Sequence, residues 1–147
     1  MARIGIITCS NLTQEFGCVS NGCLAEIKER KGFFQGYPVD ENLDLVGIIS
    51  CSGCPSVSAP QKILRRVHPL AELQVDAIHL STCITAICPF KQKYEQVINE
   101  AYPEIKVVMG THAGDTKLLQ AYVKDFFSTN LADLYKEHLK AKAQTIK

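Results

Sequence analysis

The sequence has no excess of charge of either sign and no long apolar run. Its 147 residues carry 16 Lys and Arg against 15 Asp and Glu, a formal net charge of +1. A balance this even provides no basic face for nucleic acid or acidic lipid. No stretch supplies the roughly eighteen consecutive apolar residues that a membrane-spanning helix needs. We therefore expect neither a nucleic-acid partner nor a membrane partner.

The amino terminus also lacks the features of a secretory leader. The chain opens MARIGIIT, in which one Arg and a short apolar run lead straight into a turn without a cleavage site. We therefore expect a cytoplasmic location. With 46% hydrophobic and 21% charged residues, the composition is that of an ordinary globular protein. The length suits one domain over 1–147, with an added C-terminal helix at about 130–143.

Cysteine is present in a number that does not suit a disulfide scaffold. Seven cysteines in 147 residues are too sparse for such a scaffold, and an odd number cannot pair completely within one chain. In a reducing compartment, clustered cysteines more often serve as metal ligands or catalytic thiols than as disulfides. The cysteines are therefore the first indication of function.

Strand and helix patterns alternate along the chain. Short β-branched or apolar runs predict strands at 3–8, 44–50, 75–82 and 105–109, and helical patterns predict helices at about 21–30, 59–68, 90–101 and 113–127. With right-handed crossovers, this order predicts an α/β fold. We expect a three-layer sandwich with a parallel sheet of at least four strands, flavodoxin-like or Rossmann-like, in the order second, first, third, fourth. The ligand site of such a sheet lies at the carboxyl edge of its strands.

Local signals add further expectations. Residues 11–22 and 84–87 are predicted to be loops. Ser58 is a plausible helix N-cap, and Pro69 is expected to end that helix at His68, before a short helical piece at 69–73. His79, between apolar residues of the third strand, is expected to be a core histidine or at most a neighbour of the site.

A thiol or imidazole follows every predicted strand. Because the carboxyl ends of parallel strands share one edge, these side chains are expected to meet in one hollow, with two more cysteines reaching over from the first loop. The candidates are Cys9 after the first strand, Cys51 and Cys54 after the second, Cys83 and Cys88 after the third, His112 after the fourth, and Cys18 and Cys23 from the loop.

The donor types indicate a soft metal. Thiolate and imidazole select zinc, iron or an iron–sulfur cluster over calcium and magnesium. The spacings C-x2-C from Cys51 to Cys54 and C-x4-C from Cys83 to Cys88 are short enough for both sulfurs to reach one metal. The first prediction is therefore a cysteine-rich metal-binding protein, and its thiols leave redox activity open.

A metal-free thiol–disulfide oxidoreductase is the alternative. In it Cys51 attacks and Cys54 resolves, as in C-x2-C oxidoreductases. A third hypothesis is a metal sensor or carrier whose metal occupancy changes a partner-binding surface on the helix beginning near Leu131.

Two classes of protein are excluded: nucleotide-binding proteins with a phosphate loop, and phosphatases or arsenate reductases with a C-x5-R motif. A phosphate loop would need Lys and Ser or Thr after Gly22, where Cys23 and Leu24 stand. A C-x5-R phosphatase or arsenate reductase would need Arg six residues after a cysteine, and Glu15, Val57 and Pro89 occupy those positions after Cys9, Cys51 and Cys83.

The spaced motifs IGII before Cys9, CSGCP, IHLSTC, CPF and GTH together resemble the CGGC-domain family, nearly throughout the chain as far as Gly114. Ser52 stands where the family has its first middle Gly. The resemblance implies a metal-binding domain, with zinc suggested by its many Cys and His, but no particular reaction. The donor types leave an iron–sulfur cluster as the alternative cofactor. We expect a metal ion as partner and leave a redox partner protein and a homodimer open. The ligands that the resemblance implies are Cys9, Cys18, Cys23, Cys51, Cys54, Cys83, Cys88 and His112.

Overall fold

The computed structural model describes residues 1–54, 57–114 and 116–128. Residues Met1–Thr116 form one compact unit and Lys117–Lys147 a second. The candidate site belongs entirely to the first unit. The helix predicted at about 130–143 lies outside the described residues. Within the described part of the chain, no helix combines the length and apolar character needed to cross a membrane.

Four parallel strands form the sheet of the first unit. They run in the order β2-β1-β3-β4, as the sequence predicted. The central strand β1 pairs with β2 on one side and β3 on the other, so its apolar side chains are buried on both faces. The bounds are β1 Ala2–Thr8, β2 Leu43–Ser50, β3 Ala77–Leu80 and β4 Lys106–Met109.

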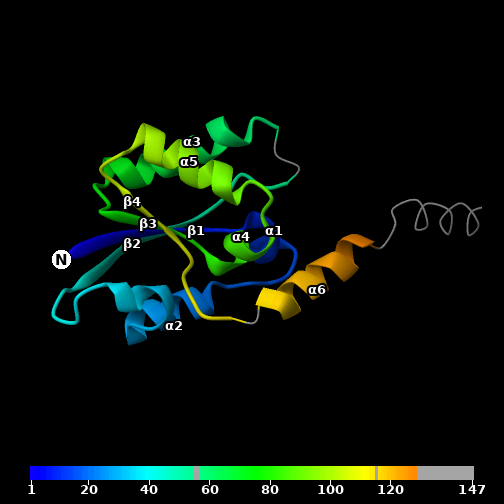
Figure 1. Cartoon of the computed structure of the whole chain (residues 1–147), viewed down its shortest axis with the longest axis horizontal. Coiled ribbons are helices and arrows are strands. Elements are labelled where there is room, and N and C mark those ends of the chain that lie inside the picture. The colour runs from blue at the N-terminus through cyan, green and yellow to red at the C-terminus, as the bar shows by residue number, and fades with distance from the viewer. Residues whose placement is uncertain (55–56, 115, 129–147) are drawn as a thin grey trace, which may run out of the picture. The chain divides into compact units, whose positions relative to one another are not determined.

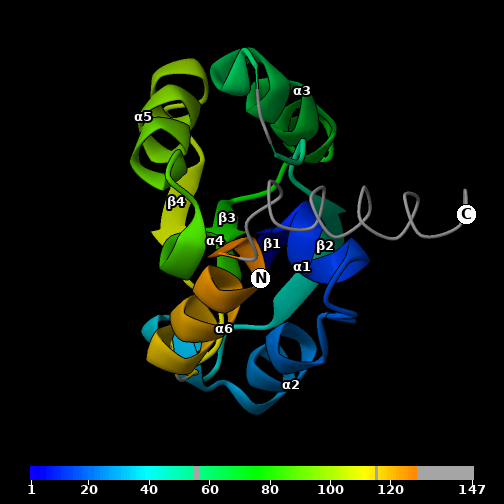
Figure 2. The same ribbon diagram turned by 90° about the vertical axis from the view of Figure 1, so that its right-hand side faces the viewer.

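Helices cover both faces of the sheet, which confirms the three-layer α/β sandwich (Figures 1 and 2). Helices α3 (Ala59–Glu72) and α5 (Lys91–Ala101) lie on one face. Helix α2 (Asn21–Glu29) and the 3-10 helix η1 (Gly32–Gly36) lie on the other. The two short helices α1 (Ser10–Gln14) and α4 (Thr82–Ile87) lie at the end of the sheet remote from the N-terminus (Figure 1). Helix α6 (Thr116–Ser128) begins where the first unit ends.

The two faces of β1 are packed differently. On one face Ile4 and Ile6 pack with Phe34 of η1 and Cys23 of α2. On the other face, a Cβ added to Gly5 would lie only 2.7 Å from a terminal methyl of Leu70. The absence of a side chain at Gly5 therefore lets α3 approach the sheet closely.

Two predicted loops are helical. Residues Ser10–Gln14 form α1, and Thr82–Ile87 form α4, where loops were expected at 11–22 and 84–87. Strand β3 accordingly ends at Leu80, two residues earlier than predicted. The buried side chain of Ile84 gives α4 an apolar face that the sequence pattern of one short turn could not reveal. Cys83 therefore lies in the first turn of a helix and not at the end of a strand.

The prediction that Pro69 ends a helix is wrong. Helix α3 continues through Pro69 to Glu72, because Val67 and Leu70 on either side of the proline are both buried on one helix face. This packing outweighs the missing N–H and the ring clash of a proline inside a helix. Ser58 does precede the helix, but it has a φ of 58° and its side chain makes no capping hydrogen bond.

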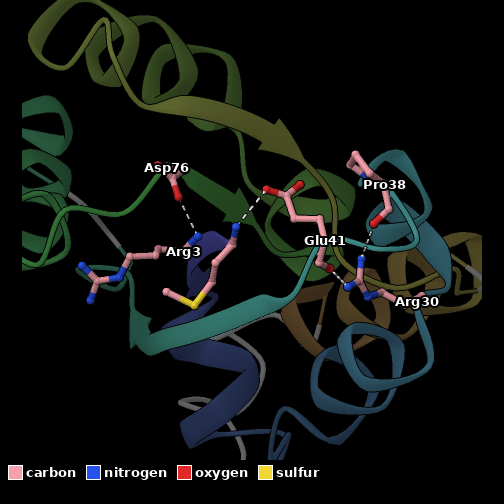
Figure 3. Close-up of polar contacts among 6 residues, drawn as sticks. Arg3, Arg30, Pro38, Glu41 and Asp76 are labelled. Carbon is pink, nitrogen blue, oxygen red and sulfur yellow. Dashed lines mark hydrogen bonds and ion pairs between the residues drawn. The ribbon is translucent and has the colours of Figure 1, made fainter.

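Polar contacts tie the segments at the amino edge of the sheet together (Figure 3). The backbone N–H of Arg3 donates to the Asp76 carboxylate at 2.7 Å, and the amino terminus lies 3.6 Å from the Glu41 carboxylate. The guanidinium of Arg30 donates to the carbonyl of Pro38 at 3.1 Å and to that of Glu41. These contacts hold the edge opposite to the candidate site.

Candidate functional site

Cys9 and Cys51 are held side by side by the sheet itself. Thr8 of β1 and Ser50 of β2 are paired in register, and each cysteine directly follows one of them. The backbone ladder continues one step further, since the N–H of Cys51 donates to the carbonyl of Thr8 at 2.8 Å. A hydrogen-bonding interaction between the two thiols raises the pKa of Cys9 and lowers that of Cys51. The first residues beyond two neighbouring strands therefore form a sulfur–sulfur pair.

Several groups favour a negative charge on Cys51. Besides the Cys9 thiol, its sulfur accepts hydrogen bonds from the backbone N–H of Ser10 at 3.2 Å and from that of Gly53. The loop can turn back to the sulfur because Gly53 has a φ of 82°. These donors, with a smaller contribution from the charge of Arg66, overcome burial and lower the Cys51 pKa to about 6.

The surroundings of Cys9 favour its protonated form, in contrast to those of Cys51. Donating its proton to Cys51 and being buried both raise the pKa of the Cys9 thiol far above its ordinary value. Only 7% of Cys9 and 8% of Cys51 is exposed, so water competes little for the shared proton. Within the pair, the negative charge is therefore favoured on Cys51 and the remaining proton on Cys9.

Cys83 is the third sulfur next to this pair. It is buried in the first turn of α4, and its sulfur accepts a hydrogen bond from the backbone N–H of Cys9 at 3.5 Å. The Ser81 hydroxyl lies 2.9 Å from the same sulfur. Burial raises the pKa of the Cys83 thiol, so Cys83 is a neutral neighbour of the Cys51 thiolate.

Cys54 and Cys88 lie further out. Cys54 is exposed and Cys88 is half-buried, and burial is the main reason why the pKa of each thiol is raised. The negative charge of Cys51 also raises the pKa of both thiols. In C-x2-C oxidoreductases the attacking thiol is usually exposed. Here Cys51, which the sequence predicted to attack, is buried, and Cys54 is exposed.

Cys23 and His112 form a separate group around Thr111. The Cys23 sulfur lies 3.3 Å from the Thr111 hydroxyl and 3.7 Å from His112 Nδ1. The same hydroxyl lies 3.1 Å from His112 Nδ1. A Cβ at Gly22 would lie 3.3 Å from the imidazole ring, so this glycine gives the ring room beside α2. Cys18 is half-buried, and it lies near enough to Cys23 and Cys83 to raise the pKa of both thiols.

The eight predicted ligands thus occur along the carboxyl edge in two groups, one around Cys51 and one around Thr111. Among the residues that the structure describes, no three His, Cys, Asp or Glu side chains are placed to hold one metal ion. The donor atoms have the chemistry of a soft-metal site, but this arrangement does not fit a resident ion with three or more protein ligands. We therefore derive no step through a metal.

His79 is a fully buried core histidine. Its Nδ1 donates to the carbonyl of Gly110 at 2.7 Å, so its Nε2 accepts the hydrogen bond from the Tyr37 hydroxyl at 2.8 Å. Phe34 stacks on its ring at a centroid distance of 4.4 Å. Burial lowers the His79 pKa, and the ring is neutral at physiological pH. This is the structural role expected for His79.

Sequence reasoning missed two contributors to the site. Thr111 is fully buried and joins α2 to α4, because its hydroxyl also accepts a hydrogen bond from the N–H of Thr82 at 3.2 Å. Its position next to His112 was the only signal. Arg66 contributes positive charge near Cys51. The spacing of Lys62, Arg65 and Arg66 on one helix could have indicated that charge.

Comparison with known proteins agrees with this fold and its cysteines. The family model of the CGGC domain matches residues 3–112. Neither the curated proteins nor the solved structures give a match. The CGGC domain is a family to which metal binding is attributed. The match covers Cys9, Cys51 and nearly all of the two strands that they follow, and it extends to His112; on this basis the chain belongs to the CGGC-domain family.

Proposed function

We propose that Cys51 and Cys9 form a dithiol that reduces disulfide bonds. The observation that supports this proposal is the register of β1 and β2, which places Cys9 and Cys51 next to each other, together with the opposite shifts in the pKa values of their thiols. A thiolate is the nucleophilic form of cysteine, and Cys51 is stabilised in that form. The partner sulfur is Cys9, which contacts Cys51, and not the exposed Cys54.

The reaction consists of two thiol–disulfide exchanges. The Cys51 thiolate attacks one sulfur of a substrate disulfide, forms a mixed disulfide and releases the first substrate thiolate. Cys9 loses its proton to the released thiolate and attacks the Cys51 sulfur, which forms the Cys9–Cys51 disulfide and releases the second substrate thiolate. The substrate gains two electrons, which the two cysteines lose, and one proton from Cys9; the second thiolate takes its proton from water. An external dithiol, from a small molecule or a redox partner protein, restores the reduced pair.

The sheet geometry permits the disulfide product. Neighbouring strands lie about 4.8 Å apart, and the Cα atoms of disulfide-bonded cysteines are typically about 4.4–6.8 Å apart. Because Cys9 and Cys51 follow registered residues of neighbouring strands, the pair can be oxidised without separating β1 from β2.

A reaction with 2-hydroxyethyl disulfide tests the proposal. Reduced protein, freed of metal and held under nitrogen, should release two equivalents of thiol and yield a Cys9–Cys51 disulfide by peptide mass spectrometry. Cys9→Ser should stop at a mixed disulfide on Cys51, and Cys51→Ser should not react at this site. Cys54→Ser is the matched control and should behave like the unchanged protein. A Cys51–Cys54 disulfide, or no reaction at Cys51, would contradict the proposal.

Metal binding is the second candidate, favoured by family membership and by the number of sulfur donors. Zinc is the first metal to expect and an iron–sulfur cluster the alternative. Its ligands would come from the eight predicted residues, after a rearrangement that brings more than two of them together. A reducing cytoplasm suits both candidates, because each requires free thiols.

Metal analysis separates the two candidates. Protein purified without oxygen would contain stoichiometric zinc or iron if the second candidate is correct, and an iron–sulfur cluster would add visible absorption. Stoichiometric metal that is lost in Cys51→Ser, together with no disulfide exchange by the metal-free protein, would favour the metal centre. Disulfide exchange without bound metal would favour the dithiol.

A further inference from the structure

A cavity opens beside the loop that carries Cys51. Its volume is about 280 Å³, and the described residues that line it are Ser52, Lys62, Arg65 and Arg66. Ser52 directly follows Cys51, and the other three belong to α3. A volume near the lower end of the range for ligand pockets suits a small molecule.

The three basic residues share one side of α3. Positions 62, 65 and 66 are spaced by three and four residues, so their side chains are neighbours on the helix surface. The side of α3 that contains Ile63 and Val67 is buried against the rest of the fold. Among the described residues, none of these three cations has an ion pair with a carboxylate. The cavity therefore has three positive charges and no described counter-charge.

Ser52 contributes an unused hydrogen-bonding group. Its hydroxyl oxygen is buried and has no hydrogen-bond partner among the described residues. A buried hydroxyl without a partner is costly, and a ligand that hydrogen-bonds to it would remove that cost. Ser52 also connects the cavity to the neighbouring residue Cys51, and the charge of Arg66 acts on the Cys51 sulfur.

We propose that this cavity binds the carboxylate groups of a small anionic disulfide and thereby presents its sulfur–sulfur bond to Cys51. The inference rests on the proposed reduction of disulfides and adds the substrate class. Arginine and lysine together attract carboxylates, and Arg65 and Arg66 can each form paired hydrogen bonds with one. The exchange itself is unchanged: Cys51 attacks, a substrate thiolate leaves, and Cys9 completes the two-electron reduction.

Binding can be measured without any chemistry. Suberate is the carbon analogue of 3,3′-dithiodipropionate, with two methylene groups in place of the two sulfurs, so it tests the cavity alone. Calorimetry on the reduced full chain should detect binding of suberate that weakens as salt is added. Lys62→Gln and Arg65→Gln should each weaken it by about fivefold, as expected for one partly exposed charge.

Lys93→Gln is the matched control. Lys93 is a cation of α5 whose ammonium contacts Gln96 at 3.1 Å, outside the cavity. The substitution removes the same net charge and should leave suberate binding unchanged. Equal losses in all three variants would show a general charge effect and overturn the inference, as would the absence of binding at low salt. Binding of inorganic phosphate as tightly as suberate would show an oxyanion site and contradict the carboxylate assignment.

A charge series of disulfides then tests the link to Cys51. The rate of exchange should fall from dianionic 3,3′-dithiodipropionate to neutral 2-hydroxyethyl disulfide and further to dicationic cystamine. Arg65→Gln should reduce this preference about fivefold. Equal rates with all three disulfides would overturn the inference but leave the dithiol proposal intact. Suberate binding without exchange of any disulfide would overturn the dithiol proposal and leave the anion site.

Discussion

Cys9 and Cys51 lie next to each other at the carboxyl edge of the sheet, where the backbone N–H of Cys51 donates to the carbonyl of Thr8 at 2.8 Å. The parallel register of β1 and β2 creates this contact, because Thr8 and Ser50 are paired and a cysteine follows each. The two thiols titrate as a coupled pair, in which loss of the first proton is favoured at Cys51. The predictions below test this pair and the packing that supports it.

Removing the donor should raise the pKa of Cys51. In Cys9→Ala the sulfur of Cys51 loses its main stabilising hydrogen bond, and its pKa should rise from about 6 towards its ordinary value of 9.0. The pH dependence of iodoacetamide alkylation at Cys51, followed by mass spectrometry, measures this shift. Cys9→Ser keeps a donor and should show a smaller change. Cys54→Ala should leave the pKa near that of the unchanged protein, and an equal rise in Cys54→Ala would contradict the assignment.

Stability should increase with pH between about 6 and 9. The pKa of Cys51 is about 6 in the folded protein, against an ordinary value of 9.0, so unfolding takes up a proton in this range. The contribution is fully present above pH 9 and is lost as pH falls through 6, with a slope of at most about 1.4 kcal/mol per pH unit.

The other thiols act in the opposite direction at higher pH. Burial raises the pKa of Cys23, Cys83 and Cys88, so their contribution to stability is present below pH 9.0 and is lost above it. Urea unfolding of the reduced protein at pH 7.0, 7.75 and 8.5, about the middle of the range in which Cys51 acts, measures the contribution of Cys51 to the free energy of unfolding. Cys51→Ser should flatten the slope, and an unchanged slope in this variant would disprove the explanation.

Tyr37→Phe should destabilise the core. It removes the hydroxyl that donates to the fully buried His79 Nε2 at 2.8 Å and leaves that nitrogen without this partner. The expected loss in the free energy of unfolding is about 1–3 kcal/mol. Tyr102→Phe is the control, because it removes an exposed contact of 3.3 Å to His68 and should cost less than about 0.5 kcal/mol. Chemical denaturation of both variants gives the comparison, and equal costs would argue against a structural role for the Tyr37–His79 contact.

Gly32→Ala should disturb the segment that holds Thr111. Gly32 has a φ of 54°, and an added Cβ would lie 2.6 Å from the backbone oxygen of Thr111, which cannot move as a flexible side chain could. We expect a loss of about 1–3 kcal/mol. Gly36→Ala lies in the same 3-10 helix, has no neighbour within 4 Å of the added Cβ, and should be nearly neutral. Thermal unfolding of the two variants measures the difference; similar melting temperatures would contradict the predicted clash.

The sequence indicated the four strands because each is a short apolar run with a turn signal after it, and their alternation with helices favoured the flavodoxin-like strand order. It also indicated that thiols and His112 follow those strands. Both inferences depend on local pattern and on one general property of parallel sheets, that their strands end at a common edge. The buried position of His79 in the core was expected from local pattern too, since apolar residues flank it.

The tertiary structure decided which of those side chains touch. The register of β1 and β2 places Cys9 next to Cys51. It also lets the backbone N–H of Ser10 donate to the Cys51 sulfur, although 41 positions separate these two residues in the sequence. The helical turn of α4 removes Cys83 from the strand end, and Thr111 gathers Cys23 and His112 into a second group. Periodicity assigns a residue to a face or an edge, but strand register, short helices and buried hydrogen bonds depend on contacts between distant segments. The sequence by itself therefore determined the edge and its chemistry, and only the folded chain determined the reactive pair.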